Sequence, residues 1–255
     1  SIFSNLAIHL KKNQDRGYED LSLFEIGPTF FGKNPGEQQI VIGGLKSGKV
    51  NRKSWLDKER NIDVFDVKSD VIKTLGELGI EEKDLFVSDN TKHCYHPGRS
   101  GSINLKSTKG PHLAYFGEMH PAIIKNLDFK DDNIFGFEIF LKNIPEPSKK
   151  LRQSKKSFHA LDYQKSERDF AFVIDDIFKI GTLEKIIKEV NEKIIQKVIT
   201  FDVYEGENIP KRKKSVAINV TLQSFDKTLT ENDLDQISKD IIKVVSEKTG
   251  ATIRS

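Results

Sequence analysis

The 255-residue sequence contains one cysteine, Cys94, and no long apolar run. A lone cysteine excludes an internal disulfide bond and fits a reducing compartment. Because no stretch of about 18 apolar residues is present, we expect no membrane-spanning helix and no membrane partner. Residues 1–5 lack the features of a secretory signal and a starting methionine, so we expect a fragment or a processed product.

The chain also has little excess charge, since 41 Lys and Arg residues face 38 Asp and Glu residues. The whole net charge of +3 comes from residues 149–156, which contain five basic residues and no acidic ones, while each flanking region is slightly acidic. A uniformly basic surface is thereby excluded. Contact with nucleic acid would have to use local patches.

The basic segment is also the best candidate for a domain boundary. It follows Pro145 and Pro147, which cannot continue a helix or a central strand. We therefore expect domains at 1–148 and 157–255, joined by a linker at 149–156. The linker cations are either solvated or in contact with phosphate groups, and both interpretations remain open. These cations are Lys149, Lys150, Arg152, Lys155 and Lys156.

Apolar periodicity in the C-terminal part predicts the order β-α-β-β-α-β, which is that of the ferredoxin-like fold. The predicted strands are 168–174, 198–204, 215–223 and 251–254, and the predicted helices are 182–195 and the segment from Thr230 to Gly250. Thr230 is a suitable helix N-cap and Gly250 a suitable helix end. Which side of the first strand is buried stays open, because Phe170 and Phe172 compete with Ala171 and Val173.

Alternation in the second of these strands predicts that Ile199, Phe201 and Val203 face the helices. The other side of the sheet then carries polar side chains and one aromatic ring, a surface that suits RNA or another protein. The predicted members of this outer face are Thr200, Asp202, Tyr204, Ala217, Asn219 and Thr221.

The N-terminal part is predicted to be an α+β domain with a mainly antiparallel sheet. Its expected strands are 21–31, 38–45, 103–105, 113–117 and 134–142, with a helix at 64–79 and a short helix opened by Pro121. The strongly apolar run from Phe135 to Leu141 suits a strand buried on both faces.

Few short motifs indicate chemistry. Lys211–Lys214 joins two predicted strands, and four adjacent cations there indicate either a solvated turn or contact with RNA phosphates. Arg99 could pair with a carboxylate or a phosphate. His93–His96 lacks the second ligand pair that zinc requires, and no glycine-rich phosphate loop follows a strand. We therefore expect no catalytic, cofactor-binding or metal-binding residue.

Several segments, taken in order, resemble one family. Residues 24–30, 95–100 and 116–121, which read FEIGPTF, YHPGRS and FGEMHP, resemble the synthetase-like module of phenylalanyl-tRNA synthetase β chains of the bacterial type. RDFAFVID at 168–175, FDVY at 201–204, KKS at 213–215 and DKTLT at 226–230 resemble the ferredoxin-fold anticodon-binding domain that ends those chains. The resemblance indicates a C-terminal fragment.

This resemblance implies a class II synthetase-like domain at 1–148 and an anticodon-binding domain at 157–255. It implies a cytoplasmic (αβ)₂ heterotetramer that charges tRNA(Phe) with phenylalanine, using ATP and Mg²⁺. Class II synthetases hold ATP with arginines, yet residues 24–31 contain no Arg or Lys and residues 134–142 contain no Arg. We therefore expect this fragment to assemble with the α subunit and bind tRNA without catalysing the reaction.

The resemblance places tRNA contacts on Arg168, Tyr204, Lys213, Lys214 and Ser215, with Lys211 and Arg212 as neighbours. Arg168 alternatively pairs with Asp169 or Asp202. Two other functions stay open. One is a ferredoxin-like regulatory module that binds a small molecule and dimerises without RNA, and the other is an enzyme that is active by itself.

Overall fold

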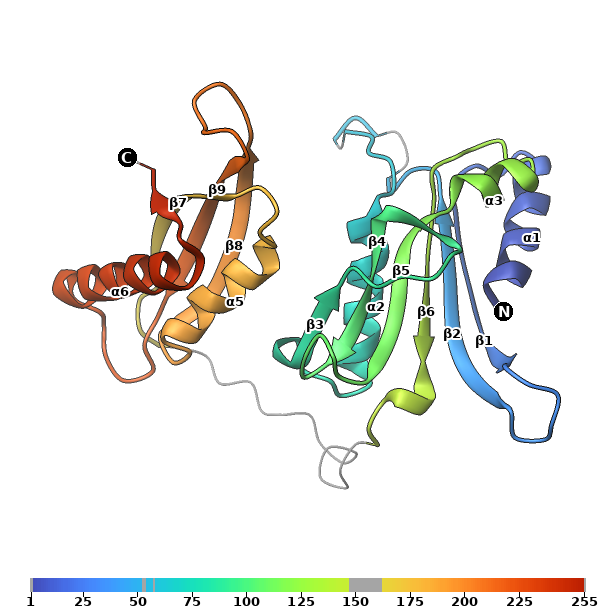
Figure 1. Cartoon of the computed structure of the whole chain (residues 1–255), viewed down its shortest axis with the longest axis horizontal. Coiled ribbons are helices and arrows are strands. Elements are labelled where there is room, and N and C mark those ends of the chain that lie inside the picture. Colours follow the sequence, from blue (N-terminus) through green and yellow to red (C-terminus); the bar gives the residue numbers. More distant parts are fainter. Residues whose placement is uncertain (1, 52–53, 57, 147–161, 255) are drawn as a thin grey trace. The chain divides into compact units, whose positions relative to one another are not determined.

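The computed structural model describes residues 2–51, 54–56, 58–146 and 162–254. It divides into two compact units, 1–155 and 156–255 (Figure 1). The predicted linker cations lie outside the described residues. Among the helices that are described, none is both long and apolar enough to cross a membrane.

The first unit is built on a six-stranded antiparallel sheet in the order β1-β2-β6-β5-β4-β3. The predicted antiparallel α+β architecture is confirmed, although the short strand β3 was not predicted and β4 begins earlier than expected. The strands are β1 (Leu21–Phe30), β2 (Gln38–Ser47), β3 (Leu85–Ser88), β4 (Tyr95–Leu105), β5 (His112–Met119) and β6 (Ile134–Phe140).

Helices cover both faces of this sheet. Helix α1 (Ile2–Asp15) packs on β1 and β2, whereas α2 (Val64–Glu77) packs on β5 and β6 on the other face. Strand β6 lies between them, and all of its residues are buried, as predicted. Gly136 permits this packing, because an added Cβ would lie 2.4 Å from a Leu45 methyl group. The short helix α3 (Pro121–Asn126) begins with the predicted proline.

The second unit has the order β10-β7-β9-β8, with antiparallel pairing throughout. The predicted β-α-β-β-α-β order is therefore confirmed. Its elements are β7 (Ser166–Asp175), α5 (Ile180–Val190), β8 (Ile195–Tyr204), β9 (Lys213–Leu222), α6 (Glu231–Thr249) and β10 (Thr252–Ile253).

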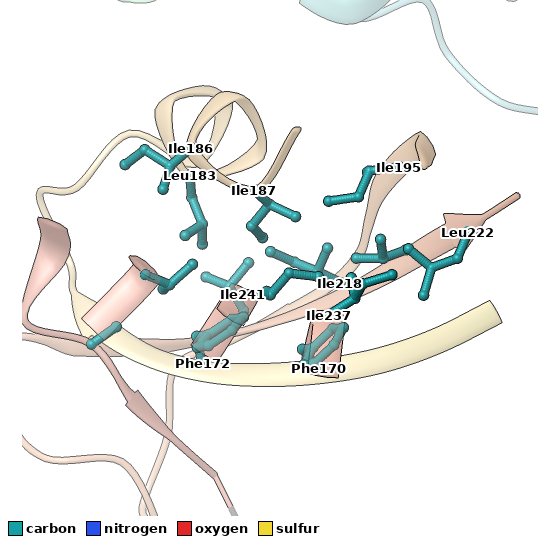
Figure 2. Close-up of a cluster of buried hydrophobic side chains, with 14 of the residues drawn as sticks. Phe170, Phe172, Leu183, Ile186, Ile187, Ile195, Ile218, Leu222, Ile237 and Ile241 are labelled. Atoms are coloured by element: carbon teal, nitrogen blue, oxygen red, sulfur yellow. The ribbon is translucent and has the colours of Figure 1, made fainter. Parts of the chain in front are cut away.

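Both helices of the second unit pack on one side of its sheet. Figure 2 shows Leu183 and Ile187 of α5 and Ile241 of α6 gathered with Phe170 and Phe172 of β7. The side of β7 that carries the phenylalanines, not the side with Ala171 and Val173, is therefore the buried one. The larger apolar area of a phenylalanine side chain explains this choice.

Helix α6 starts and ends where the sequence predicts. The Thr230 side chain accepts a hydrogen bond from the Asp233 backbone, and the Asp233 side chain bonds back to the Thr230 backbone. This capping box satisfies two backbone N–H groups at the helix start. Gly250 ends the helix with a left-handed φ of 68°. Val245 is fully buried at its last turns.

The predicted orientation of β8 is wrong for residues 199–201. Val198 pairs with the buried Val220, so Ile199, which pairs with Asn219, lies on the outer face. A β-bulge between Thr200 and Asp202 then leaves Phe201 unpaired and 58% exposed.

The bulge shifts the alternation by one residue, so the prediction fails at Thr200 but holds for residues 202–204. Thr200 faces the helices, because its hydroxyl donates to Glu184 of α5 at 2.7 Å. Val203 pairs with the buried Val216 on the helix side yet stays partly exposed. Of the predicted outer-face residues of β8, Asp202 and Tyr204 keep their place and Thr200 does not.

Candidate nucleic-acid interface

Most of the candidate RNA-contacting residues lie at one end of the second sheet. Tyr204, near the end of β8, pairs with Ser215 of β9, and residues 205–212 connect the two strands. The loop is fixed by backbone bonds, since Lys213 N donates to Pro210 O at 3.0 Å and Asp176 N donates to Arg212 O at 3.0 Å. We name Tyr204, Ser215 and Lys211–Lys214 the basic hairpin end.

The four cations of the basic hairpin end are not equivalent. Lys213 Nζ lies 3.8 Å from Asp175 Oδ1, and Lys214 Nζ donates to the Asp176 carbonyl at 2.6 Å. Lys211 and Arg212 are exposed, and the described part of the chain gives neither an ion-pair partner. These two side chains are therefore the ones best placed to meet an external anion.

A fifth cation, missed by the sequence reasoning, joins this end of the sheet. The Arg254 guanidinium lies 5.8 Å from the centre of the Tyr204 ring, and the Arg254 backbone N–H donates to Ala171 O. The two side chains approach each other across the outer face from its opposite edges, β8 and β10. Ser215 between them is buried, which leaves it unavailable for direct contact with a large ligand.

The ring position of Tyr204 is also constrained by the loop. An added Cβ at Gly206 would lie 2.2 Å from the tyrosine hydroxyl oxygen. Any larger residue at 206 would therefore displace the ring.

The outer face next to the basic hairpin end offers both apolar and polar groups. Phe201 and Ile199 are exposed there, and Asn219 donates to Asp169 at 2.7 Å. Flat exposed rings beside cations are the usual means of holding single-stranded nucleic acid. Phe201 lies two residues after the outward-facing Ile199 and is 58% exposed, so it follows the same alternation to the outer face.

Arg168 does not belong to this group. Its guanidinium donates to Glu231 at 2.5 Å, at the start of α6, so neither Asp169 nor Asp202 is its partner. Arg168 pairs with Val220 while Ile174 pairs with Lys214, which separates Arg168 from the basic hairpin end by roughly 20 Å along the strands. The predicted RNA-contacting role of Arg168 thus lacks support from its neighbours.

Two models of known families match the chain. The model described as "Phenylalanyl tRNA synthetase beta chain CLM domain" matches residues 1–141, more than half of the sequence. The model described as "Ferredoxin-fold anticodon binding domain" matches residues 162–254. The chain belongs to the phenylalanyl-tRNA synthetase β-chain family.

Individual relatives agree with this assignment. Phenylalanine–tRNA ligase β subunits from Paramagnetospirillum magneticum and Rhodospirillum rubrum are 36% and 37% identical to it over 254 and 255 residues. The subunit from Rickettsia bellii is 36% identical over 255 residues. Each alignment covers 100% of this chain but only 28–31% of the relative, so the chain spans about a third of the length of these β subunits.

The first unit of this β-chain family member has a different surface feature. Phe24, Ile26 and Phe30 of the edge strand β1 point to the face opposite α1 and are exposed, Phe24 by 75%. Ile40 pairs with Pro28 and extends the same surface onto β2. We name Phe24, Ile26, Phe30 and Ile40 the β1–β2 patch. Large contiguous apolar surfaces of this kind mark protein contacts.

Arg99 of the same unit is occupied within the protein. Its guanidinium holds Glu118 through two nitrogens, and Nη2 donates to Oε1 at 2.7 Å. Of the two partners considered for Arg99, the structure therefore supplies the carboxylate. The described residues contain no group of three potential metal-ligating side chains.

Proposed function

We propose that the chain is the part of a phenylalanine–tRNA ligase β subunit that binds tRNA(Phe) and assembles with the α subunit. The basic hairpin end carries the first half of this proposal. It combines free cations, Lys211 and Arg212, with the ring of Tyr204 inside a unit that matches an anticodon-binding family. Cations beside a stacking ring can hold the backbone and one base of RNA together.

The proposed contacts differ in kind. Lys211 and Arg212 neutralise RNA phosphates, and Tyr204 stacks on a base. Lys213 and Lys214 fix the loop and add to its positive electrostatic potential. Ser215 pairs with Tyr204 across the two strands. We propose no RNA contact for Arg168 at this surface, because its guanidinium donates to Glu231. We keep the predicted contacts of Lys149, Lys150 and Arg152 with RNA phosphates.

A binding experiment tests the tRNA half. The 255-residue chain and its Lys211→Ala/Lys214→Ala variant are titrated with tRNA(Phe) over a series of salt concentrations. We expect weaker binding and a shallower salt dependence for the variant, because counterion release scales with the phosphates neutralised. Unchanged affinity together with an unchanged salt slope would remove the basic hairpin end from the proposal.

The β1–β2 patch supports the assembly half. An exposed apolar face on an edge strand favours association, and the relatives are named as β subunits. We propose that this patch docks on the α subunit within an (αβ)₂ heterotetramer. Covering Phe24, Ile26 and Phe30 would remove large apolar side chains from water.

Co-expression tests the assembly half. The chain is produced with an α chain of phenylalanine–tRNA ligase, and the mixture is separated by size. We expect Phe24→Ser/Ile26→Ser to abolish co-elution. The matched control, Ile177→Ser/Phe225→Ser, removes two exposed apolar side chains of the second unit and should co-elute normally. Co-elution of the patch variant at the native level would refute this docking site.

The residues of the first unit do not fit an ATP–Mg²⁺ site of their own. Strand β1 carries no Arg or Lys, and the only carboxylate of β6, Glu138, is engaged by Lys92. We therefore propose that the first unit is a class II synthetase-like domain without catalysis. ATP and Mg²⁺ would bind elsewhere in the heterotetramer, which would work in the cytoplasm.

The alternative function, a ferredoxin-like regulatory module that binds a small molecule without RNA, has less support. A small-molecule module that dimerises through sheet edges would use β8 or β10, the edge strands of the second unit. The match to an anticodon-binding family and the cations at 211–212 argue against it. Ligand-dependent dimerisation without tRNA affinity would reverse this preference.

A further inference from the structure

The first unit contains a buried carboxylate in a strand that is otherwise apolar or glycine. Glu138 of β6 is 2% exposed, and the strand on either side of it is buried throughout. Glu138 pairs with Tyr115 of β5, and Phe140 follows two residues later on the same face of the sheet. A buried carboxylate of this kind needs a cationic partner or a proton.

One partner of Glu138 is an ammonium group held by two aromatic rings. Lys92 Nζ donates to Glu138 Oε2 at 2.7 Å and lies 4.9 Å from the Tyr115 ring centre and 4.7 Å from that of Phe140. The two rings stand at 87° to each other with their centres 5.8 Å apart, so they form a corner closed by the carboxylate. Ring faces and a carboxylate are the groups that bind organic ammonium ions.

The titratable side chains next to this corner add no positive charge that would compete with a cationic ligand. The His112 ring packs on Tyr115 with centres 3.9 Å apart, and its Nδ1 is hydrogen-bonded to Asn104 at 2.9 Å. Burial, and then the charge of Lys92, lowers the pKa of His112, which keeps this ring neutral at physiological pH. Tyr95 on the same side of the sheet is fully buried, and burial raises its pKa, so it adds no charge.

Lys92 differs from the other members of the cluster in where it comes from. Tyr115, Glu138 and Phe140 belong to adjacent central strands, β5 and β6. Lys92 belongs to the irregular segment between β3 and β4, and its side chain is 38% exposed. The strands therefore form the corner without the lysine, and the lysine reaches it from the solvent side.

We propose that Glu138, Tyr115 and Phe140 form a binding site for a primary ammonium group, and that Lys92 occupies it as an internal ligand. The ligand class is a primary alkylammonium ion, which offers the same charge and N–H donors as the lysine side chain. The internal ligand ties residues 89–94 to the sheet and keeps the site closed. This site is independent of the proposed tRNA and α-subunit contacts.

Removing the lysine side chain tests this assignment by rescue. Lys92→Ala in the 255-residue chain should lower the melting temperature by several degrees, because the buried Glu138 loses the ammonium group of Lys92. Propylammonium chloride should restore much of this loss in a saturable manner, whereas sodium chloride at the same ionic strength should not. The native chain should respond equally to the two salts.

Two further variants define the site. Lys92→Met keeps the length of the side chain but blocks the corner, so it should not respond specifically to propylammonium. Lys92→Ala/Glu138→Gln removes the anion, so propylammonium should no longer restore stability. If Lys92→Ala is unfolded, the refolded fraction after dilution from urea in each salt replaces the melting temperature. A response to propylammonium no greater than that to sodium, or one that persists in the double variant, overturns the proposal.

Discussion

Replacing Lys211 and Arg212 together by alanine gives the sharpest test of the RNA interface. Both side chains are exposed, whereas Lys213 and Lys214 are held by Asp175 and the Asp176 carbonyl. The double substitution should therefore remove phosphate contacts without disturbing the fold. Surface substitutions of this kind change stability little.

The magnitude follows from counterion release. Each neutralised phosphate contributes about 0.7–0.9 to the slope of log K against log salt, so the loss of two contacts should flatten the slope by roughly 1.4–1.8. Between about 50 and 200 mM salt, the ratio of variant to native Kd should then fall roughly ninefold. The variant thus binds much worse at low salt and approaches the native protein at high salt.

Titration of tRNA(Phe) by fluorescence anisotropy at several salt concentrations measures both quantities. The matched control is Lys239→Ala/Lys243→Ala on α6, which removes the same charge from exposed positions on the helix side of the unit. We expect this control to keep the native slope. Equal slopes for the two double variants would show that only net charge matters, and the assignment of the basic hairpin end would be wrong.

Three further predictions concern the second unit. Tyr204→Ala should weaken tRNA binding by about 1–3 kcal/mol with little change in salt slope, while Tyr204→Phe keeps the ring and the affinity. In urea unfolding, Phe172→Ala, at a fully buried position, should cost roughly 3–5 kcal/mol. Phe201→Ala should cost well under half as much, because that ring is 58% exposed. The hydrogen bond from Lys227, with those from Thr230, lowers the pKa of Asp233 to about 2. Because the folded value lies below the unfolded value of about 3.9, this contribution to stability is full at neutral pH and is lost as pH falls towards 2. The stability of Asp233→Asn, measured by thermal unfolding with circular dichroism, should therefore depend less on pH in that window than the stability of the native chain.

Local rules predict much of the second unit. Thr230 and Gly250 mark the ends of α6 because capping and the left-handed helix end depend on residues only a few positions apart. Strand β9 follows simple alternation, since its large apolar residues, Val216, Ile218, Val220 and Leu222, all lie on one face. Elements of this kind could be assigned from the sequence because their signals are short-range and agree with one another.

Strand β8 shows where such reasoning fails. Its sequence offers two apolar series, one containing Val198 and the other Ile199 and Phe201, so alternation alone does not decide which one faces the helices. Pairing of Val198 with Val220 and the bond between Thr200 and Glu184 select the first series. The bulge at Phe201 then changes the periodicity partway along the strand, an event that depends on the partner strand.

The same limit explains why Arg254 and Lys92 were missed. A carboxylate such as Glu138 within a buried strand implies that a cation must come to it, and this much follows from the sequence. The identity of that cation does not follow, because Lys92 is 46 residues away and lies in an irregular segment whose path depends on packing. Arg254 meets Tyr204 only because β10 and β8 bring them to opposite edges of one face. Residues that act in pairs across a sheet are thus assigned reliably only when the strand order is known.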